Sequence, residues 1–207
     1  MVNHKHNFIF IHIPKTAGEA LSKALDIDVQ THKYTFRLEK EIMDKHETIT
    51  EYMSLNQNNI DYFKFAFVRN PWDRAVSLWS YYLKRNIKPV SDNDFETCIK
   101  NFETLFCEVP AKYYSNSQRK VNLLYPQYHF ISDWYGNNML DYIGRFETLQ
   151  EDFNIVCDKI GIPPQELPHT NQSNHKHYTE YYDDKTRAII SQKYAKDIEY
   201  FRYRFGD

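Results

Sequence analysis

The chain has 207 residues, a length that suits one folded domain with a sizeable core. Its hydrophobic content of 42% excludes a disordered protein, and its net charge of −2 excludes a global basic field that would attract nucleic acid. We therefore expect a single domain over residues 1–207 and no nucleic-acid partner.

Cysteine usage and hydropathy indicate the compartment. Cys98, Cys107 and Cys157 are odd in number and lack C-x-x-C spacing, so we expect reduced, buried thiols rather than a disulfide framework. No apolar run reaches the length of a membrane span, and the polar N-terminus MVNHKHN lacks the apolar centre of a signal peptide. We expect this N-terminus to be a solvated tail and the protein to be cytoplasmic.

The first element is a strand that leads into a loop with one lysine. Residues Phe8–Ile13 are mostly β-branched or aromatic and predict a buried strand that stops before Pro14. The loop Lys15–Gly18 follows, and the pattern of residues 21–25 then predicts a helix. The amides and dipole of such a helix start favour a phosphate, to which Lys15 adds a full charge. An ordinary turn with a solvated lysine is the alternative interpretation.

A helix with its own start signal comes next. Thr48 followed by Glu51 is the pattern of a capping box, and apolar residues between positions 49 and 55 form one side of the predicted helix. His46 lies just before this helix start.

A second strand and helix repeat the arrangement of the first pair. Residues Tyr62–Val68 predict a strand that ends at Arg69, and Pro71 suits the first position of a helix. Ser77 lies eight residues after Arg69, about two helical turns into this helix. Ligands of open α/β sheets bind beyond the carboxyl ends of the strands. Lys15 and Arg69 should therefore meet one anion with two charged ends.

The remaining elements extend this pattern towards the C-terminus. We expect an N-cap at Asp92 or Asp94, a helix from Thr148 that ends at Gly161, a loop over Leu167–Tyr178 and a last helix from Asp184. This order predicts an α/β fold of three layers, with a mostly parallel sheet flanked by helices.

These motifs together resemble the sulfotransferases that use 3′-phosphoadenosine 5′-phosphosulfate (PAPS), in particular the carbohydrate and heparan-sulfate 2-O-type group. The quoted stretches are IHIPKTAG, FAFVRNPWDRAVSLWSYY, DYIGRFE and LPHTNQSNHKHY, which together span nearly the whole chain. The resemblance implies a P-loop-kinase-like fold with a strand over Asp141–Glu147. It also implies that Lys15, Thr16, Ala17 and Gly18 hold the 5′-phosphosulfate, that Arg69 and Ser77 hold the 3′-phosphate, and that Ser173 and Lys176 touch the nucleotide.

The chain departs from the family pattern directly after the loop. The family usually has Ser or Thr at one of the two positions that Glu19 and Ala20 occupy here. We expect the backbone amides of this segment to hold the anion still, with Glu19 pointing away and with weaker binding. A nucleotide-binding protein of the same fold with little or no turnover is the alternative function. A kinase is disfavoured, because Lys15 precedes Gly18 and a Walker A loop with its Mg²⁺-binding Ser/Thr is absent.

The implied reaction is sulfuryl transfer from PAPS to a hydroxyl, which leaves adenosine 3′,5′-bisphosphate. The acceptor would be a carbohydrate or another small molecule, and no metal is implied. Lys15 would neutralise charge on the leaving phosphate, and His46 would act as general base at the position where several sulfotransferases carry a catalytic histidine. His12, which we expect in the core, and His32 are the rival candidates for the base.

Overall fold

The structure is a computed structural model, and it describes residues 1–27, 47–55, 61–88, 90–102, 124–168 and 176–207. The chain divides into two compact units, one formed by residues 1–68 and 127–170 and the other by residues 69–126 and 171–207. The single domain expected from the length stays a prediction.

The first unit is built on a four-stranded sheet. Its strands are β1 (Val2–Asn3), β2 (Phe8–Ile11), β3 (Phe63–Val68) and β4 (Tyr142–Arg145), in the order β1-β2-β3-β4. The strands β2, β3 and β4 are parallel, whereas β1 runs antiparallel to β2. The expected solvated tail is therefore wrong for Val2 and Asn3, since this segment pairs with the edge of β2 and buries the side chain of Val2.

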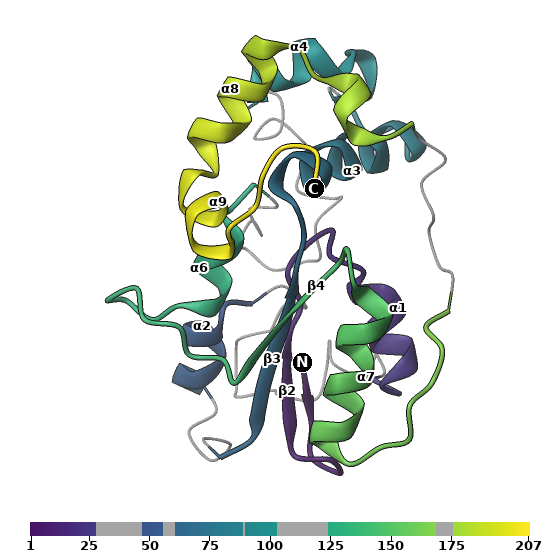
Figure 1. Ribbon diagram of the computed structural model, residues 1–207, viewed down its shortest axis with the longest axis vertical. Coiled ribbons are helices and arrows are strands. Elements are labelled where there is room, and N and C mark those ends of the chain that lie inside the picture. The colour runs from purple at the N-terminus through teal and green to yellow at the C-terminus, as the bar shows by residue number, and fades with distance from the viewer. Residues whose placement is uncertain (28–46, 56–60, 89, 103–123, 169–175) are drawn as a thin grey trace. The chain divides into compact units, whose positions relative to one another are not determined.

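Helices lie on both sides of this sheet. Figure 1 shows α1 (Gly18–Ala24) and α7 (Leu149–Ile160) beside one face, and α2 (Ile49–Leu55) and α6 (Gln127–Ile131) beside the other. The face toward α1 and α7 carries an aromatic core of alternate strand residues, with Leu21, Leu25, Phe153 and Val156 packed against Phe8, Phe10, Phe65 and Phe67. The α/β class with a mostly parallel sheet is confirmed.

Local capping signals decide where several of these helices begin and end. The N–H of Thr48 donates to Glu51 Oε2 over 2.9 Å, and the N–H of Glu51 donates to Thr48 Oγ1 over 3.2 Å, which is the predicted capping box. At the end of α7, Gly161 has a φ of 70°, the left-handed conformation that glycine adopts without strain.

The second unit is helical within its described residues. It contains α3 (Pro71–Lys84), α4 (Phe95–Lys100), α8 (Asp184–Lys193) and α9 (Ala195–Phe201), with short 3-10 turns at Val90–Asp92 and Tyr178–Tyr181. The single last helix expected from the sequence is wrong, because it breaks at Tyr194 into α8 and α9. The Tyr194 side chain is buried, and its hydroxyl donates to the carbonyl of Leu124 over 3.0 Å.

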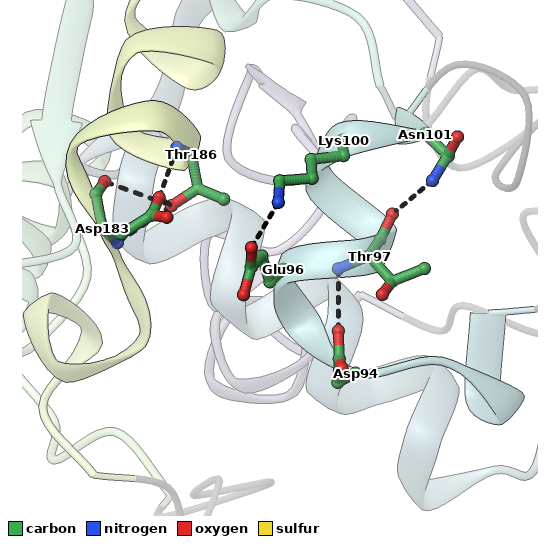
Figure 2. Close-up of polar contacts among 7 residues, drawn as sticks. All are labelled: Asp94, Glu96, Thr97, Lys100, Asn101, Asp183 and Thr186. Atoms are coloured by element: carbon green, nitrogen blue, oxygen red, sulfur yellow. Dashed lines mark hydrogen bonds and ion pairs between the residues drawn. The ribbon is translucent and has the colours of Figure 1, made fainter.

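Side-chain caps start α4 and α8, as Figure 2 shows. Asp94 accepts a hydrogen bond from the N–H of Thr97 over 2.7 Å, so of the two expected caps Asp94 begins α4. Asp183 accepts from the N–H of Thr186 over 2.7 Å, and the Thr186 hydroxyl completes a capping box. These bonds stabilise the carboxylates, and the pKa of each of the two Asp side chains is lowered.

Two further expectations concern cysteines and membranes. Cys98 and Cys157 are free and buried, as expected, whereas Cys107 lies outside the described residues. Burial raises the pKa of the Cys98 thiol to about 11, which keeps it protonated and unreactive at neutral pH. Among the described residues, no helix has both the length and the hydropathy needed to cross a membrane.

Candidate functional site

The loop between β2 and α1 has an unusual backbone. Lys15 has a φ of 71° and Ala17 a φ of 65°, so two residues with side chains adopt the left-handed region. Such a conformation costs about 1–3 kcal/mol per residue and is concentrated at binding and catalytic sites. The buried side chain of Thr16 supports the loop from within, because its hydroxyl donates to the carbonyl of Ile13 over 2.9 Å.

The amides of this loop are available to an anion. Within the described part of the chain, the backbone N–H groups of Thr16, Ala17 and Gly18 have no hydrogen-bond acceptor. Alternation of left-handed and other conformations turns successive N–H groups toward one point, which forms the concave anion site known as a nest. The half-buried Lys15 and the start of α1 add positive potential to this cluster of donors.

The two residues that depart from the family pattern differ in their exposure on α1. Glu19 is exposed, whereas Ala20 is buried. Because the residue Glu19 is exposed, solvent screens its charge.

The second candidate group follows β3. Arg69 comes directly after Val68, and its Nε donates to Asp73 Oδ2 over 2.7 Å. Both side chains of this pair are largely buried, with 8% and 15% of their surfaces exposed, so the pair fixes the plane of the guanidinium group. Asp73 was not predicted from the sequence as a partner of Arg69. Its position four residues after Arg69, at the start of a predicted helix, could have indicated the pair.

The segment from Asn70 to Ser77 is built as the sequence predicts. The Asn70 side chain accepts from the N–H of Trp72 over 3.1 Å, and Pro71 occupies the first turn of α3. Asn70 also donates to the carbonyl of Arg204 and the hydroxyl of Tyr178, which ties the start of α3 to the C-terminal segment of the same unit. Ser77 is buried on α3, with 8% of its surface exposed.

Some of the remaining predicted site residues lie within the described part of the chain and others do not. His46 and Ser173 lie outside the described residues, as does the rival His32. His12 is buried and its ring stacks on that of Phe10, as expected for a core position. Lys176 is exposed and its Nζ lies 3.8 Å from Glu180 Oε2, a surface ion pair of the kind that contributes little to stability.

The two groups of predicted site residues are distributed over the two units. Lys15, Thr16, Ala17, Gly18, Glu19 and Ala20 belong to the first unit, and Arg69, Ser77 and Lys176 belong to the second. Within the first unit, Ile11 of β2 pairs in parallel with Ala66 of β3, so the two strands end at the same edge of the sheet. None of the described residues form a group of His, Cys, Asp or Glu that could hold a metal ion.

Comparison with known proteins identifies the family. The sequence model of the sulfotransferase family matches residues 1–204. Carbohydrate sulfotransferase 9 of Homo sapiens is 27% identical over 228 residues, which covers 95% of this chain and 47% of the human protein. A protein of Archaeoglobus fulgidus, named only as an uncharacterized protein, is 33% identical over 107 residues, which covers 50% of this chain and 72% of the archaeal one.

The family model and the human relative differ in how much of their length this chain covers. This chain spans about half of the length of the human relative, and no solved structure gives a significant match. The family match runs through the loop of Lys15, Arg69 and the strand β4, and it ends only three residues before the end of the chain. The chain belongs to the sulfotransferase family.

Proposed function

We propose that this protein transfers a sulfuryl group from PAPS to a hydroxyl group of a carbohydrate or another small acceptor. The observation that carries the proposal is the nest of three amides at Thr16, Ala17 and Gly18, in a loop where Lys15 and Ala17 are left-handed. A family that transfers sulfate needs such a site for the phosphosulfate end of its donor. The name of the human relative supports a carbohydrate as the acceptor.

The residues of the loop fit a phosphate group. Three N–H donors, a lysine and a helix start are the features that bind anions without a metal. Lys15 would place its charge next to the bridging oxygen, where negative charge grows as the S–O bond to the leaving phosphate breaks. Glu19 and Ala20 would add the positive potential of the first turn of α1, but the amide of Ala20 already donates to the carbonyl of Ala17 over 3.0 Å, so it does not extend the cradle.

The other residues would position the donor and accept a proton. Arg69, held by Asp73, and Ser77 would bind the 3′-phosphate, with Ser173 and Lys176 against the nucleotide. His46 would take the proton from the acceptor hydroxyl as its oxygen forms the new bond to sulfur, and adenosine 3′,5′-bisphosphate would leave. Enzymes of phosphoryl transfer likewise act mainly by holding the reacting groups in line and by stabilising the developing charge. We propose that the chain has the corresponding P-loop-kinase-like fold in a single domain. We propose a cytoplasmic location for this enzyme.

A second candidate is a nucleotide-binding protein with little or no turnover. It is favoured by Glu19 and Ala20, which remove a hydroxyl donor from the phosphate site. The two candidates share the donor site and differ in chemistry alone, so transfer of labelled sulfate from PAPS to a library of acceptors separates them. Mg²⁺-dependent transfer of phosphate from ATP would contradict both.

The donor site is tested by calorimetry with three nucleotides. We expect adenosine 3′,5′-bisphosphate to bind more tightly than AMP or ATP, because Arg69 and Ser77 are assigned to the 3′-phosphate that only the bisphosphate carries. Lys15→Ala should weaken binding, whereas Lys23→Ala, which removes an exposed lysine from the last turn of α1, should not. Equal affinities for the bisphosphate and AMP would contradict the proposed donor.

A further inference from the structure

A short turn between α6 and β4 displays two aromatic side chains to solvent. It comprises Ser132–Asn138, here called the aromatic turn, and in Figure 1 it is the green segment that projects beside α6. Trp134 is 86% exposed and Tyr135 is 92% exposed. Large aromatic residues usually bury most of their surface, as Trp72 does at 4% exposure, so an adjacent exposed pair requires an explanation.

The aromatic turn is held rigid by its own polar groups. One carboxylate oxygen of Asp133 accepts from the N–H groups of Tyr135 and Asn137 over 2.9 and 2.8 Å, and the other accepts from the Asn137 side chain over 2.9 Å. The N–H of Asp133 donates to the carbonyl of Asn137 over 2.9 Å, and the hydroxyl of Tyr128 in α6 donates to the carbonyl of Gly136. Because the turn is already ordered, the binding of a stacking ligand would cost little conformational entropy of the turn.

The charge of the segment restricts the class of ligand. Residues 132–141 contain two aspartates and no lysine or arginine. Anionic lipid surfaces and polyanionic glycans both require basic residues, and their negative charge would be repelled by Asp133. Asp141 is paired with Lys64, whose Nζ lies 3.9 Å from Asp141 Oδ2. The faces of aromatic rings carry negative potential, which attracts the weakly positive C–H groups of an uncharged sugar ring.

The position of the turn separates it from the loop of Lys15. The segment enters the sheet at the amino end of β4, where the N–H of Asp141 donates to the carbonyl of Lys64 near the start of β3. The loop of Lys15 instead leaves the sheet at the carboxyl end of β2, and β2, β3 and β4 are parallel. A sugar unit on the aromatic turn would therefore be remote from the hydroxyl that receives sulfate.

We propose that the aromatic turn is a secondary binding platform for neutral sugar units of an oligosaccharide acceptor, with Trp134 and Tyr135 as the stacking surfaces. This inference rests on the proposed transfer to a carbohydrate and adds the class of acceptor, an oligomer with uncharged units. Contacts to remote units supply binding energy that orients the reacting end, so the platform should favour long acceptors over short ones.

Tryptophan fluorescence tests this proposal without any assay of sulfate transfer. The chain has three tryptophans, and Trp134 is the exposed one, since Trp72 is buried and Trp79 is half-buried. Acrylamide should therefore quench mainly Trp134, and a panel of neutral oligosaccharides of two to eight units should contain ligands that protect it. Protection should grow with ligand length, and uronic-acid or sulfated oligosaccharides should not protect.

Calorimetry with a protecting oligosaccharide then assigns the contact to the turn. We expect Trp134→Ala and Tyr135→Ala each to weaken binding by about tenfold. Trp134→Phe should retain most of the affinity, and Tyr200→Ala, which removes an exposed aromatic residue from α9, should retain all of it. Circular dichroism should show the same folded spectrum for all four variants, because the replaced side chains are exposed.

Several results would contradict the proposed binding platform. Unchanged affinity in Trp134→Ala, or no protection by any neutral oligosaccharide, would do so, as would shielding by phosphatidylcholine vesicles. Shielding that rises with protein concentration and coincides with dimerisation in sedimentation would instead assign the turn to a second copy of the chain. If adenosine 3′,5′-bisphosphate still binds in these cases, the platform alone fails; if the bisphosphate does not bind, the proposed function fails.

Discussion

The imidazole ring of His12 occupies the space in which a side chain on Gly18 would begin. A Cβ atom added to Gly18 would come within 1.8 Å of His12 Nε2 and 1.9 Å of His12 Cδ2, far inside any real contact. The His12 ring stacks on Phe10 at 5.8 Å between centroids, and Phe10 stacks on Phe65 at 5.2 Å. Gly18 is therefore required where α1 starts, because its missing side chain lets the loop of Lys15 close over His12.

Replacing this glycine should disturb both the fold and the anion site. We expect Gly18→Ala to lower the free energy of unfolding by about 1–3 kcal/mol, the usual cost of overpacking, and to weaken binding of adenosine 3′,5′-bisphosphate. Chemical denaturation and calorimetry measure the two effects. Because His12 is the side chain in the way, the double variant His12→Ala/Gly18→Ala should lose less stability than the sum of the single changes. Strict additivity would show that the two residues do not compete for this space.

The pair formed by Arg69 and Asp73 predicts a graded loss of affinity. Arg69→Ala should weaken binding of the bisphosphate by about 1.5–3 kcal/mol, the usual value of a hydrogen bond to a charged group, and should leave AMP binding unchanged. Asp73→Asn keeps an acceptor for Arg69 Nε but removes the charge that orients it, so we expect a smaller loss of the same selectivity. Calorimetry with both nucleotides measures this, and equal losses for AMP and the bisphosphate would remove Arg69 from the 3′-phosphate.

Lys15 should act on the chemical step as well as on binding. Its contact strengthens as the leaving phosphate gains charge, so Lys15→Ala should lower kcat in addition to raising KM for PAPS. Steady-state kinetics with an acceptor found in the library screen measures both parameters. A variant that raised KM alone would show that Lys15 binds the donor without stabilising the transition state.

The assignment of His46 as general base predicts a contrast with His12. His46→Ala should lower kcat by about 10²–10⁴, the usual contribution of general acid–base catalysis, with little change in bisphosphate affinity. His12→Ala should instead lower the melting temperature, because the ring is buried against Phe10 and Gly18. Wild-type kcat should fall on acidification, because a protonated imidazole cannot accept the proton of the acceptor hydroxyl. A folded His46→Ala enzyme with near-normal kcat would move the role to His32 or to Glu19.

The cap of α8 predicts acid sensitivity of the second unit. The folded pKa of Asp183 lies below its ordinary value because of its hydrogen bonds from the side chain and the backbone N–H of Thr186. Its contribution to stability is therefore present above the unfolded pKa of about 3.9 and is lost as pH falls through the lower folded value. Thermal melts between about pH 2 and pH 6 should show a smaller acid-induced fall in Asp183→Asn, since Asn caps helices as well as Asp but does not titrate. The control Asp184→Asn removes a carboxylate from the same turn but keeps this cap, so it should keep the wild-type pH dependence.

Much of the architecture was predictable from local patterns. Composition predicted the strands Phe8–Ile11 and Phe63–Val68, because parallel strands buried on both faces appear as short apolar runs. The strand at Tyr142–Arg145 was expected from the family resemblance instead. Thr48, Asn70–Pro71 and Gly161 marked helix ends, because capping depends on residues only a few positions apart. The same local character made the loop of Lys15 a candidate anion site before any fold was known.

Contacts between residues that are far apart in the sequence could be seen only in the tertiary structure. Sequence cannot show that Val2 and Asn3 pair with β2, that the last helix breaks where the buried Tyr194 bonds to Leu124, or that His12 occupies the space of a Gly18 side chain. The pattern at Tyr135–Asn138 predicts a turn, but it does not show that Trp134 and Tyr135 are exposed, since aromatic residues in a sequence favour a core. Local propensity acts over one or two turns of chain, whereas burial depends on which segments meet in the fold, and that is what placed the nest of amides beside His12 and left the aromatic turn in solvent.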